Sequence, residues 1–110
     1  MAKALLVVLS NPVSADREDE YNKWYDAVHL PEVLTVPGIV AGSRYRAGAT
    51  QIVPLVGELA KYKYLAIYEL DRDPTEVIKG LIAASQSGQI GDSELLSKDP
   101  GPMTLFYETP

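Results

Sequence analysis

The sequence predicts an α+β domain in which four strands and two helices alternate in the order βαββαβ. Apolar or alternating segments that are typical of strands occur at residues 4–9, 39–46, 62–70 and 103–108. Segments with apolar residues at helical spacing separate the first strand from the second and the third from the fourth. Two such strand–helix–strand halves are typical of a ferredoxin-like sandwich, in which both helices cover one face of a four-stranded antiparallel sheet.

Size and composition fit a single domain that spans residues 1–110. The chain has 110 residues, of which 46% are hydrophobic and 23% charged, values close to the averages of globular proteins. The net charge of −5 argues against a nucleic-acid partner, because a phosphate backbone would be repelled. The absence of cysteine removes disulfides, thiolate metal sites and cysteine nucleophiles. The longest apolar run, 4–9, is too short for a signal-peptide core or a membrane span, so we expect a cytoplasmic protein with no membrane partner.

The first helix is expected to begin after Asp16 and to end near His29. Asp16 is a favourable N-cap residue, and three acidic residues at 18–20 follow it, where negative charge stabilises a helix N-terminus. The apolar face of this helix consists of Tyr21, Trp24, Tyr25 and Val28. Pro31 disfavours helical dihedral angles in the residue before it, which predicts that the helix stops there and that a separate short turn follows at 32–34.

The remaining elements are expected to be two central strands, a second helix and a last strand. Residues 39–46 alternate as a strand with one partly solvated face. Arg44 and Arg46 lie on one side of this strand and are expected to form surface or dimer ion pairs, with binding of a carboxylate as the alternative. The second helix is expected to start at an N-cap, Asp73, followed by a proline at the first helical position. Its buried stripe is expected to contain Val77, Ile78, Leu81 and Ile82.

One face of the predicted sheet has no helix to cover it, although its strands carry apolar and aromatic residues. Such a face is expected to pack against a second sheet, so we expect a homodimer in which two sheets form an α+β barrel. Two connections, 47–61 and 88–102, are longer than usual. The first is rich in apolar residues and is expected either to cover a pocket or to pack on a partner, which leaves an assembly larger than a dimer open.

His29 is the one histidine of the chain and the leading candidate for chemistry. Helical spacing places it at the edge of the apolar stripe, beside Tyr25 and Asn22 in the last turn. A half-desolvated imidazole in this position can transfer a proton near neutral pH, and Asp26, three residues earlier, could orient one ring nitrogen. The alternative is that His29 only caps carbonyls at the helix C-terminus, where histidine is favoured in any case. The spacing leaves both interpretations open.

Aromatic residues are the second candidate feature, since the chain has seven tyrosines and one phenylalanine. Tyr45, Tyr64 and Tyr68 lie in predicted strands, and with Trp24 and Tyr25 they could line a small apolar pocket that binds an aromatic ligand. The alternative is that they form cross-strand pairs or fill a dimer interface.

Other site types have little support in the sequence. No metal site is expected, because the chain lacks the closely spaced histidine and carboxylate ligands that such a site needs. Glycine-rich nucleotide loops and a serine nucleophile elbow are also missing from the sequence. No cofactor is therefore expected, although haem needs only one axial ligand and His29 leaves it open as an alternative.

The residues around His29 resemble a known family. The run Glu20-Tyr-Asn-Lys-Trp-Tyr-Asp-Ala-Val-His-Leu-Pro-Glu-Val-Leu34, followed by Val36-Pro-Gly38 and Ser43-Arg-Tyr45, is similar to the EthD-like branch of the dimeric α+β barrel superfamily. The similar motif is a helix with Trp/Tyr-x-x-x-His-x-Pro, then Pro-Gly, then a strand with Arg-Tyr. This resemblance implies a ferredoxin-like subunit that dimerises sheet to sheet, and it places the family's motif histidine on His29 and its aromatics on Trp24 and Tyr25.

The resemblance also implies a range of functions, since the superfamily includes cofactor-free monooxygenases, polyketide cyclases, isomerases, dehydratases and haem-handling enzymes. The leading hypothesis is a cofactor-independent enzyme that binds an apolar aromatic or polyketide-like molecule, with His29 and Asp26 in proton transfer. Substrate contacts are expected from Trp24, Tyr25, Tyr45, Tyr64 and Tyr68. The alternatives are a non-catalytic protein that binds a hydrophobic ligand and a haem enzyme with His29 as axial ligand.

Overall fold

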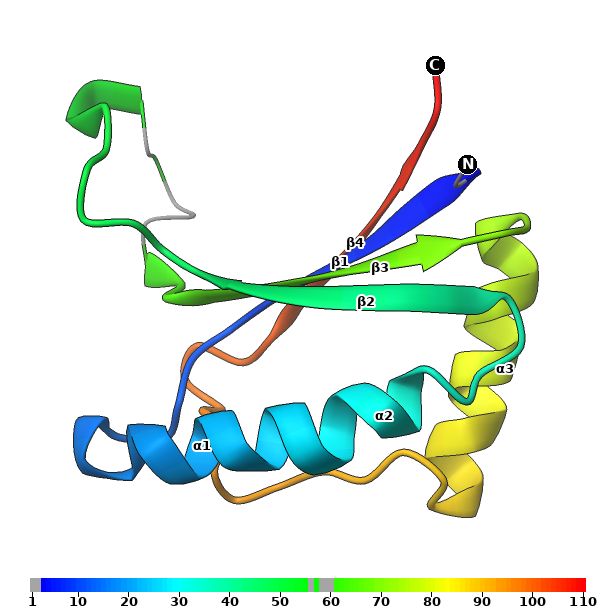
Figure 1. Ribbon diagram of the computed structural model, residues 1–110, viewed down its shortest axis with the longest axis horizontal. Coiled ribbons are helices and arrows are strands. Elements are labelled where there is room, and N and C mark those ends of the chain that lie inside the picture. The colour runs from blue at the N-terminus through cyan, green and yellow to red at the C-terminus, as the bar shows by residue number, and fades with distance from the viewer. Residues whose placement is uncertain (1–2, 56, 58–60) are drawn as a thin grey trace.

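The protein folds into one antiparallel sheet with its helices on a single face, as the computed structural model of residues 3–55, 57 and 61–110 shows (Figure 1). The strands are β1 (Ala4–Ser10), β2 (Ile39–Arg46), β3 (Tyr64–Leu70) and β4 (Met103–Glu108). Their order in the sheet is β2-β3-β1-β4, and each neighbouring pair is antiparallel. The predicted ferredoxin-like α+β fold is therefore confirmed.

Two helical segments link the strands. Between β1 and β2 the chain forms consecutive turns, which are η1 (Ala15–Arg17), α1 (Glu18–Trp24), the π-helical turn η2 (Tyr25–His29) and α2 (Leu30–Val33). The long helix α3 (Pro74–Ser87) links β3 to β4, and a 3-10 turn, η3 (Val53–Leu55), lies between β2 and β3. In the described ranges, no helix has the length and apolar character needed to cross a membrane.

The first helix does not end near His29, contrary to the expectation from Pro31. Leu30 keeps helical dihedral angles, with φ −60° and ψ −46°, and its N–H donates to the carbonyl of Tyr25 five residues earlier. A proline ring normally clashes with the carbonyl four residues before it and has no N–H to donate there. The wider turn of η2 ends just before Pro31 and accommodates the ring, so the helical path continues into α2.

The predicted N-cap is wrong for α1 and confirmed for α3. α1 begins at Glu18 after the 3-10 turn η1, with Arg17 at the N-cap position, so the expectation that Asp16 is the N-cap was wrong. In α3 the expected N-cap is confirmed, because the Asp73 carboxylate accepts a hydrogen bond of 2.8 Å from the Thr75 N–H.

The core lies between the sheet and the helices. Its largest fully buried apolar side chains are Tyr21, Tyr68, Leu70, Val36 and Val77. α3 contributes Val77 and Ala84 with Leu81 packed against them, whereas Ile78 and Ile82 remain 39% and 53% exposed. Residues 77, 81 and 84 follow one line along the helix, and 78 and 82 lie to its side. The predicted buried stripe of α3 was therefore too wide.

An irregularity in β2 decides which of its side chains face the helices. The register between β2 and β3 shifts between Ile39 and Ala41. Ile39 is buried, and Arg44 turns towards the helices, where its side chain is only 10% exposed. The expectation of a surface position for Arg44 was therefore wrong, whereas Arg46 at the strand end is exposed.

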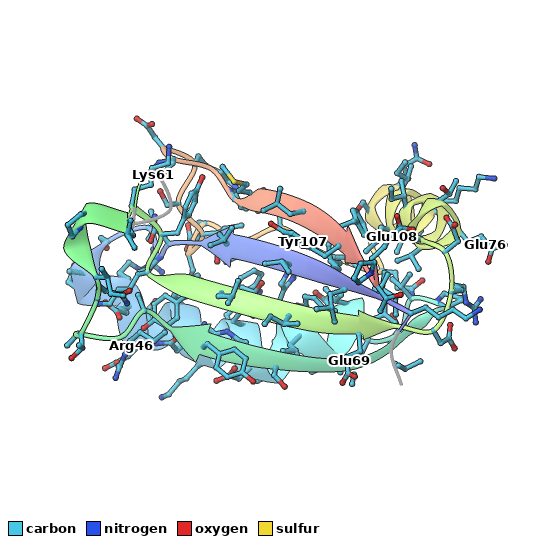
Figure 2. All side chains as sticks on the ribbon, turned by 90° about the horizontal axis from the view of Figure 1, so that it is seen from above. Arg46, Lys61, Glu69, Glu76, Tyr107 and Glu108 are labelled. Carbon is cyan, nitrogen blue, oxygen red and sulfur yellow. The ribbon has the colours of Figure 1, made fainter. Side chains whose placement is uncertain are left out.

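The opposite face of the sheet is not covered by a helix, and Figure 2 looks down on it. Strand alternation and register place on this face the apolar residues Leu5, Val7, Leu9, Leu65, Ile67 and Leu105. Two tyrosines, Tyr45 and Tyr107, also lie there and are 56% and 55% exposed. We call this set the open face.

The two long connections lie on different sides of the sheet. Residues 56 and 58–60 of the first connection lie outside the described residues, but Ile52 and Leu55 are strongly exposed, and residues 47–55 lie on the side away from the helices (Figure 1). The second connection, 88–102, returns beneath the helices and bridges back to the end of β1 through Pro12 and Leu96. It is this second connection that forms part of a cavity wall.

A glycine in β2 provides a test of the packing between sheet and cavity. A Cβ on Gly42 would lie 2.9 Å from the ring of the buried Tyr68, which is closer than packed side chains approach, so the ring would have to shift. We expect Gly42→Ala to reduce the free energy of unfolding by about 1–3 kcal/mol. Gly48→Ala is the matched control, because the nearest atom to its Cβ would lie at 3.9 Å. Urea denaturation compares the two variants, and equal stability would contradict the expectation.

Candidate functional site

A cavity of about 220 Å³ lies between the sheet and the helices. All four major parts of this region contribute to its wall: the inner faces of β1, β3 and β4, the turn η2 with α2, helix α3, and the connection 88–102. Most of the lining side chains are aliphatic, and the large polar ones are Tyr25, His29 and Tyr68. An apolar cavity of about 150 Å³ is known to hold benzene, so this cavity has room for a substituted single ring.

The π turn η2 determines how the aromatic side chains meet beside this cavity. In a regular α-helix, residues five apart point about 140° away from each other. Because η2 widens the helix, Trp24 and His29 come together and their rings stack at 4.6 Å with an interplanar angle of 21°. Tyr25 contacts the same imidazole edge-on at 4.9 Å. His29 is thus held between two aromatic rings at the cavity wall.

The imidazole of His29 is largely buried, with 18% of the side chain exposed. Burial lowers the pKa of His29 below its ordinary value, and this effect outweighs the negative charges of Glu32 and Asp92, which raise it. His29 is therefore neutral at pH 7 and can accept a proton. Its Nδ1 is buried and forms no hydrogen bond to any described residue.

Tyr68 places a second polar group at the same cavity. Its ring is 1% exposed, and its hydroxyl has no hydrogen-bond partner in the described part of the chain. Burial raises the pKa of Tyr68 to about 12, so the hydroxyl stays protonated and can donate a hydrogen bond. Burial raises the pKa of Tyr25 as well, and the nearby Tyr68 adds to this effect.

Asp26 does not contact His29, although the sequence suggested that it would orient the imidazole. Its carboxylate accepts a hydrogen bond of 2.8 Å from Arg44 Nη1, and its side chain is 66% exposed. The carboxylate that approaches His29 instead belongs to Glu32, with Oε1 at 3.8 Å from Nδ1. This distance is too long for a hydrogen bond but short enough for an ion pair with a protonated imidazole.

Arg44 is the main residue that sequence reasoning did not place at the site. Its guanidinium carbon lies 4.3 Å from the Tyr25 ring centre, and 5.4 and 5.2 Å from those of Tyr21 and Tyr64. It also donates to Asn22 Oδ1 at 2.9 Å. Arg44 therefore binds β2 to the helix that carries His29. The alternation of the strand puts Arg44 on one face, but only the register shift near Ala41 shows that this face is the inner one.

The other predicted substrate contacts are divided among three places. Trp24 stacks behind His29 and does not line the cavity. Tyr64 faces the helices but belongs to a separate polar cluster, in which its hydroxyl donates to Glu18 and accepts from Asn22. Tyr45 lies on the open face. Of the expected residues, only Tyr25, His29 and Tyr68 meet at the cavity.

The residues at the cavity do not fit haem. A haem needs space well beyond that of a single ring, and its two carboxylates need polar or cationic partners. The cavity has about 220 Å³, and among the residues that the structure describes no arginine or lysine lines it. Elsewhere in the described ranges, no three histidine, aspartate or glutamate side chains come together as a metal site would require.

The buried histidine should make the folded protein less stable in mild acid. Because its pKa is below the ordinary 6.5 in the folded state, the unfolded chain takes up the proton first as the pH falls. The free energy of unfolding should therefore decrease as the pH drops below about 6.5, and more steeply than in His29→Gln. Urea denaturation of both proteins above pH 7 and near pH 5.5 measures this difference. Parallel losses in the two proteins would contradict it.

Comparison with known proteins identifies the fold. The chain matches no protein-family model and no curated protein sequence. A proposed monooxygenase from Shewanella loihica PV-4 has a TM-score of 0.63 at 14% identity, over 100% of this chain and 97% of that one. The haem-degrader MhuD of Mycobacterium tuberculosis, solved with two haems in its active site, has a TM-score of 0.62 at 15% identity, over 96% and 94%.

A third similar structure is an ethyl tert-butyl ether degradation (EthD) family protein from Bacillus halodurans. It has a TM-score of 0.55 at 15% identity, and the match covers 100% of both chains. At such low identities the likeness extends to the backbone and not to individual site residues. The chain therefore has the ferredoxin-like fold that the EthD family protein, the Shewanella protein and the haem-degrader share.

Proposed function

We propose that this protein is a cofactor-independent enzyme that moves a proton on a small aromatic molecule bound in the cavity. The observation that carries the proposal is the pair formed by His29 and Tyr68. One is a buried neutral imidazole and the other a buried protonated phenol, and both line the same, mostly aliphatic cavity. The buried Tyr68 hydroxyl has no partner among the described residues, and an unpartnered buried polar group is costly to the fold, so a ligand that satisfies this hydroxyl is the expected compensation.

The two groups have complementary chemical roles. The neutral His29 can act as a general base that removes a proton from a carbon next to a carbonyl, or from a phenol. The Tyr68 hydroxyl can donate a hydrogen bond to the oxygen on which negative charge then develops. The mostly aliphatic lining lowers the local polarity and so strengthens both interactions. Oxygenation, cyclisation, isomerisation and dehydration of aromatic or polyketide-like compounds can all begin with this step.

The structural neighbours support this proposal in different degrees. The proposed monooxygenase and the EthD family protein are compatible with chemistry on a small organic substrate. The haem ligand of the haem-degrader is not carried over, because the cavity of this chain is too small and its described lining has no cationic side chain. Size and lining therefore favour a single-ring substrate with one carbonyl or hydroxyl group.

Binding and proton transfer can be tested with 4-hydroxyacetophenone, a single ring that carries a phenol and a carbonyl. We expect it to bind, and we expect the protein to accelerate deuterium incorporation into its methyl group in D₂O, followed by NMR. His29→Gln should reduce this rate about 100-fold or more, as expected for loss of a general base. Binding without exchange would favour the non-catalytic alternative, and absence of binding would contradict the ligand class.

Tyr68→Phe gives a second readout on the same ligand. The variant should weaken binding about tenfold, the effect of one lost hydrogen bond, as measured by calorimetry. It should leave the free energy of unfolding unchanged or slightly higher, because the removed hydroxyl has no hydrogen-bond partner among the described residues. A strongly destabilised variant would show that Tyr68 has a structural partner instead.

We further propose that two copies of the chain pack through the open face. This face exposes aliphatic side chains of three strands together with Tyr45 and Tyr107, an arrangement that a second sheet would bury. The face carries few charges, although Glu69 lies on it near one end (Figure 2). A second copy, related by a two-fold axis, would bury this apolar surface against the same surface of its own sheet.

Native mass spectrometry tests the dimer, which should have twice the 12.0 kDa mass of one chain. Ile67→Glu, at the centre of the open face, should shift the protein to a monomer because a buried charge would face its copy. Ile82→Glu is the matched control, since Ile82 is exposed on α3, away from that face. A monomeric native protein, or a dimer that survives Ile67→Glu, would contradict the proposed interface.

A further inference from the structure

The connection 88–102 is fastened beside the cavity by residues of the first helical segment. Gln89 Nε2 donates to Thr35 Oγ1 at 2.5 Å, and the Gly91 N–H donates to Glu32 Oε1 at 3.3 Å. Ile90 lies between these two anchors and lines the cavity. Its own N–H donates to the Ala84 carbonyl at the end of α3. Residues 89–91 are therefore held in place where they form the wall.

The oxygen that holds Gly91 is also the one that faces His29. Glu32 Oε1 lies 3.8 Å from His29 Nδ1, and the side chain of Glu32 is 28% exposed. A carboxylate oxygen has room for two donors. One atom of Glu32 can thus bind the cavity wall and the imidazole together.

Other charged groups near His29 have partners of their own. Asp92, on the same connection, accepts two hydrogen bonds from Lys98 at 2.6 and 2.8 Å. Arg44 approaches from β2 and is engaged by Asp26 and Asn22. Tyr25 and Tyr68 line the same cavity as neutral phenols, and the Tyr25 ring contacts the imidazole edge-on. Glu32 is the carboxylate whose atoms lie within ion-pair distance of the imidazole.

We propose that Glu32 is a positioning residue that sets the tautomer and orientation of His29 and connects them to the wall at Gly91. The inference rests on the proposed function, in which His29 is the base. With the proton of the neutral imidazole on Nδ1, facing Glu32, the lone pair of Nε2 is left for the substrate. When Nε2 takes the substrate proton, Nδ1–H stays in place and Glu32 stabilises the new positive charge without taking up a proton itself. The 3.8 Å separation shortens at that point, as apo distances in such pairs commonly do.

A purely structural role for Glu32 is the competing explanation, and two variants separate it. Glu32→Gln removes the charge but keeps an oxygen that can accept from the Gly91 N–H. Glu32→Ala removes both. Asp26→Asn is the comparison variant, because Asp26 is also three residues from His29 but binds Arg44.

NMR on the ligand-free protein labelled with ¹⁵N-histidine gives the decisive measurement, since the chain has a single histidine. We expect the Nδ1–H tautomer to dominate in the native protein. Glu32→Gln should lower the pKa of His29 and reduce the dominance of this tautomer, while Asp26→Asn should change both much less. A native protein in the Nε2–H tautomer would overturn the proposal, as would a Glu32→Gln variant whose histidine signals and pKa equal those of the native protein.

Two further measurements complete the test. Hydrogen exchange at the Gly91 amide should become faster in Glu32→Ala and stay close to the native rate in Glu32→Gln. Equally faster exchange in both variants would indicate that the charge of Glu32 is needed to hold Gly91, which would contradict its separate role at His29. In the deuterium assay, Glu32→Gln should slow exchange about tenfold or more. If the native protein catalyses no exchange, the proposed function fails, yet the tautomer and pKa results still decide the role of Glu32.

Discussion

The hydrogen bond from the Leu30 N–H to the Tyr25 carbonyl is the contact on which the site depends. It closes a turn one residue wider than that of an α-helix, and it does so directly before a proline that would otherwise end the helix. Because the helical path continues, the Glu32 carboxylate lies beside the imidazole, with Oε1 at 3.8 Å from His29 Nδ1. The same wide turn lets Trp24 stack on His29. One backbone irregularity thus brings together an imidazole, the aromatic ring that stacks on it and a carboxylate.

Arg44 ties this turn to the sheet. Its guanidinium lies among three tyrosine rings and donates to Asn22 and Asp26, so a strand and a helix share one buried cation. Tyr25 lies under this cation and also packs against His29. The packing that stabilises the fold therefore continues directly into the side chains that line the cavity.

Burial shifts the pKa values of His29 and Tyr68 in opposite directions. Loss of solvation disfavours the charged form of any group, so it lowers the pKa of His29 and raises that of Tyr68. Both groups are therefore neutral at pH 7, one as a proton acceptor and the other as a donor. An aliphatic cavity alone is enough to prepare an acid–base pair of this kind, provided that the backbone brings the two residues to the same wall.

Local periodicity and residue type were enough to predict the order of strands and helices, the N-cap of α3 and His29 as the candidate for chemistry. The sequence did not predict the hydrogen bond between Asp26 and Arg44. It also did not predict that Glu32 lies beside His29, because Pro31 indicated that the helix ends before Glu32. The sequence also did not show that Tyr68 lies at the cavity whereas Tyr64 and Tyr45 do not, since all three occupy predicted strands. Those outcomes depend on the π turn and on the register shift in β2, which residue type and periodicity do not reveal because tertiary packing overrides local preference.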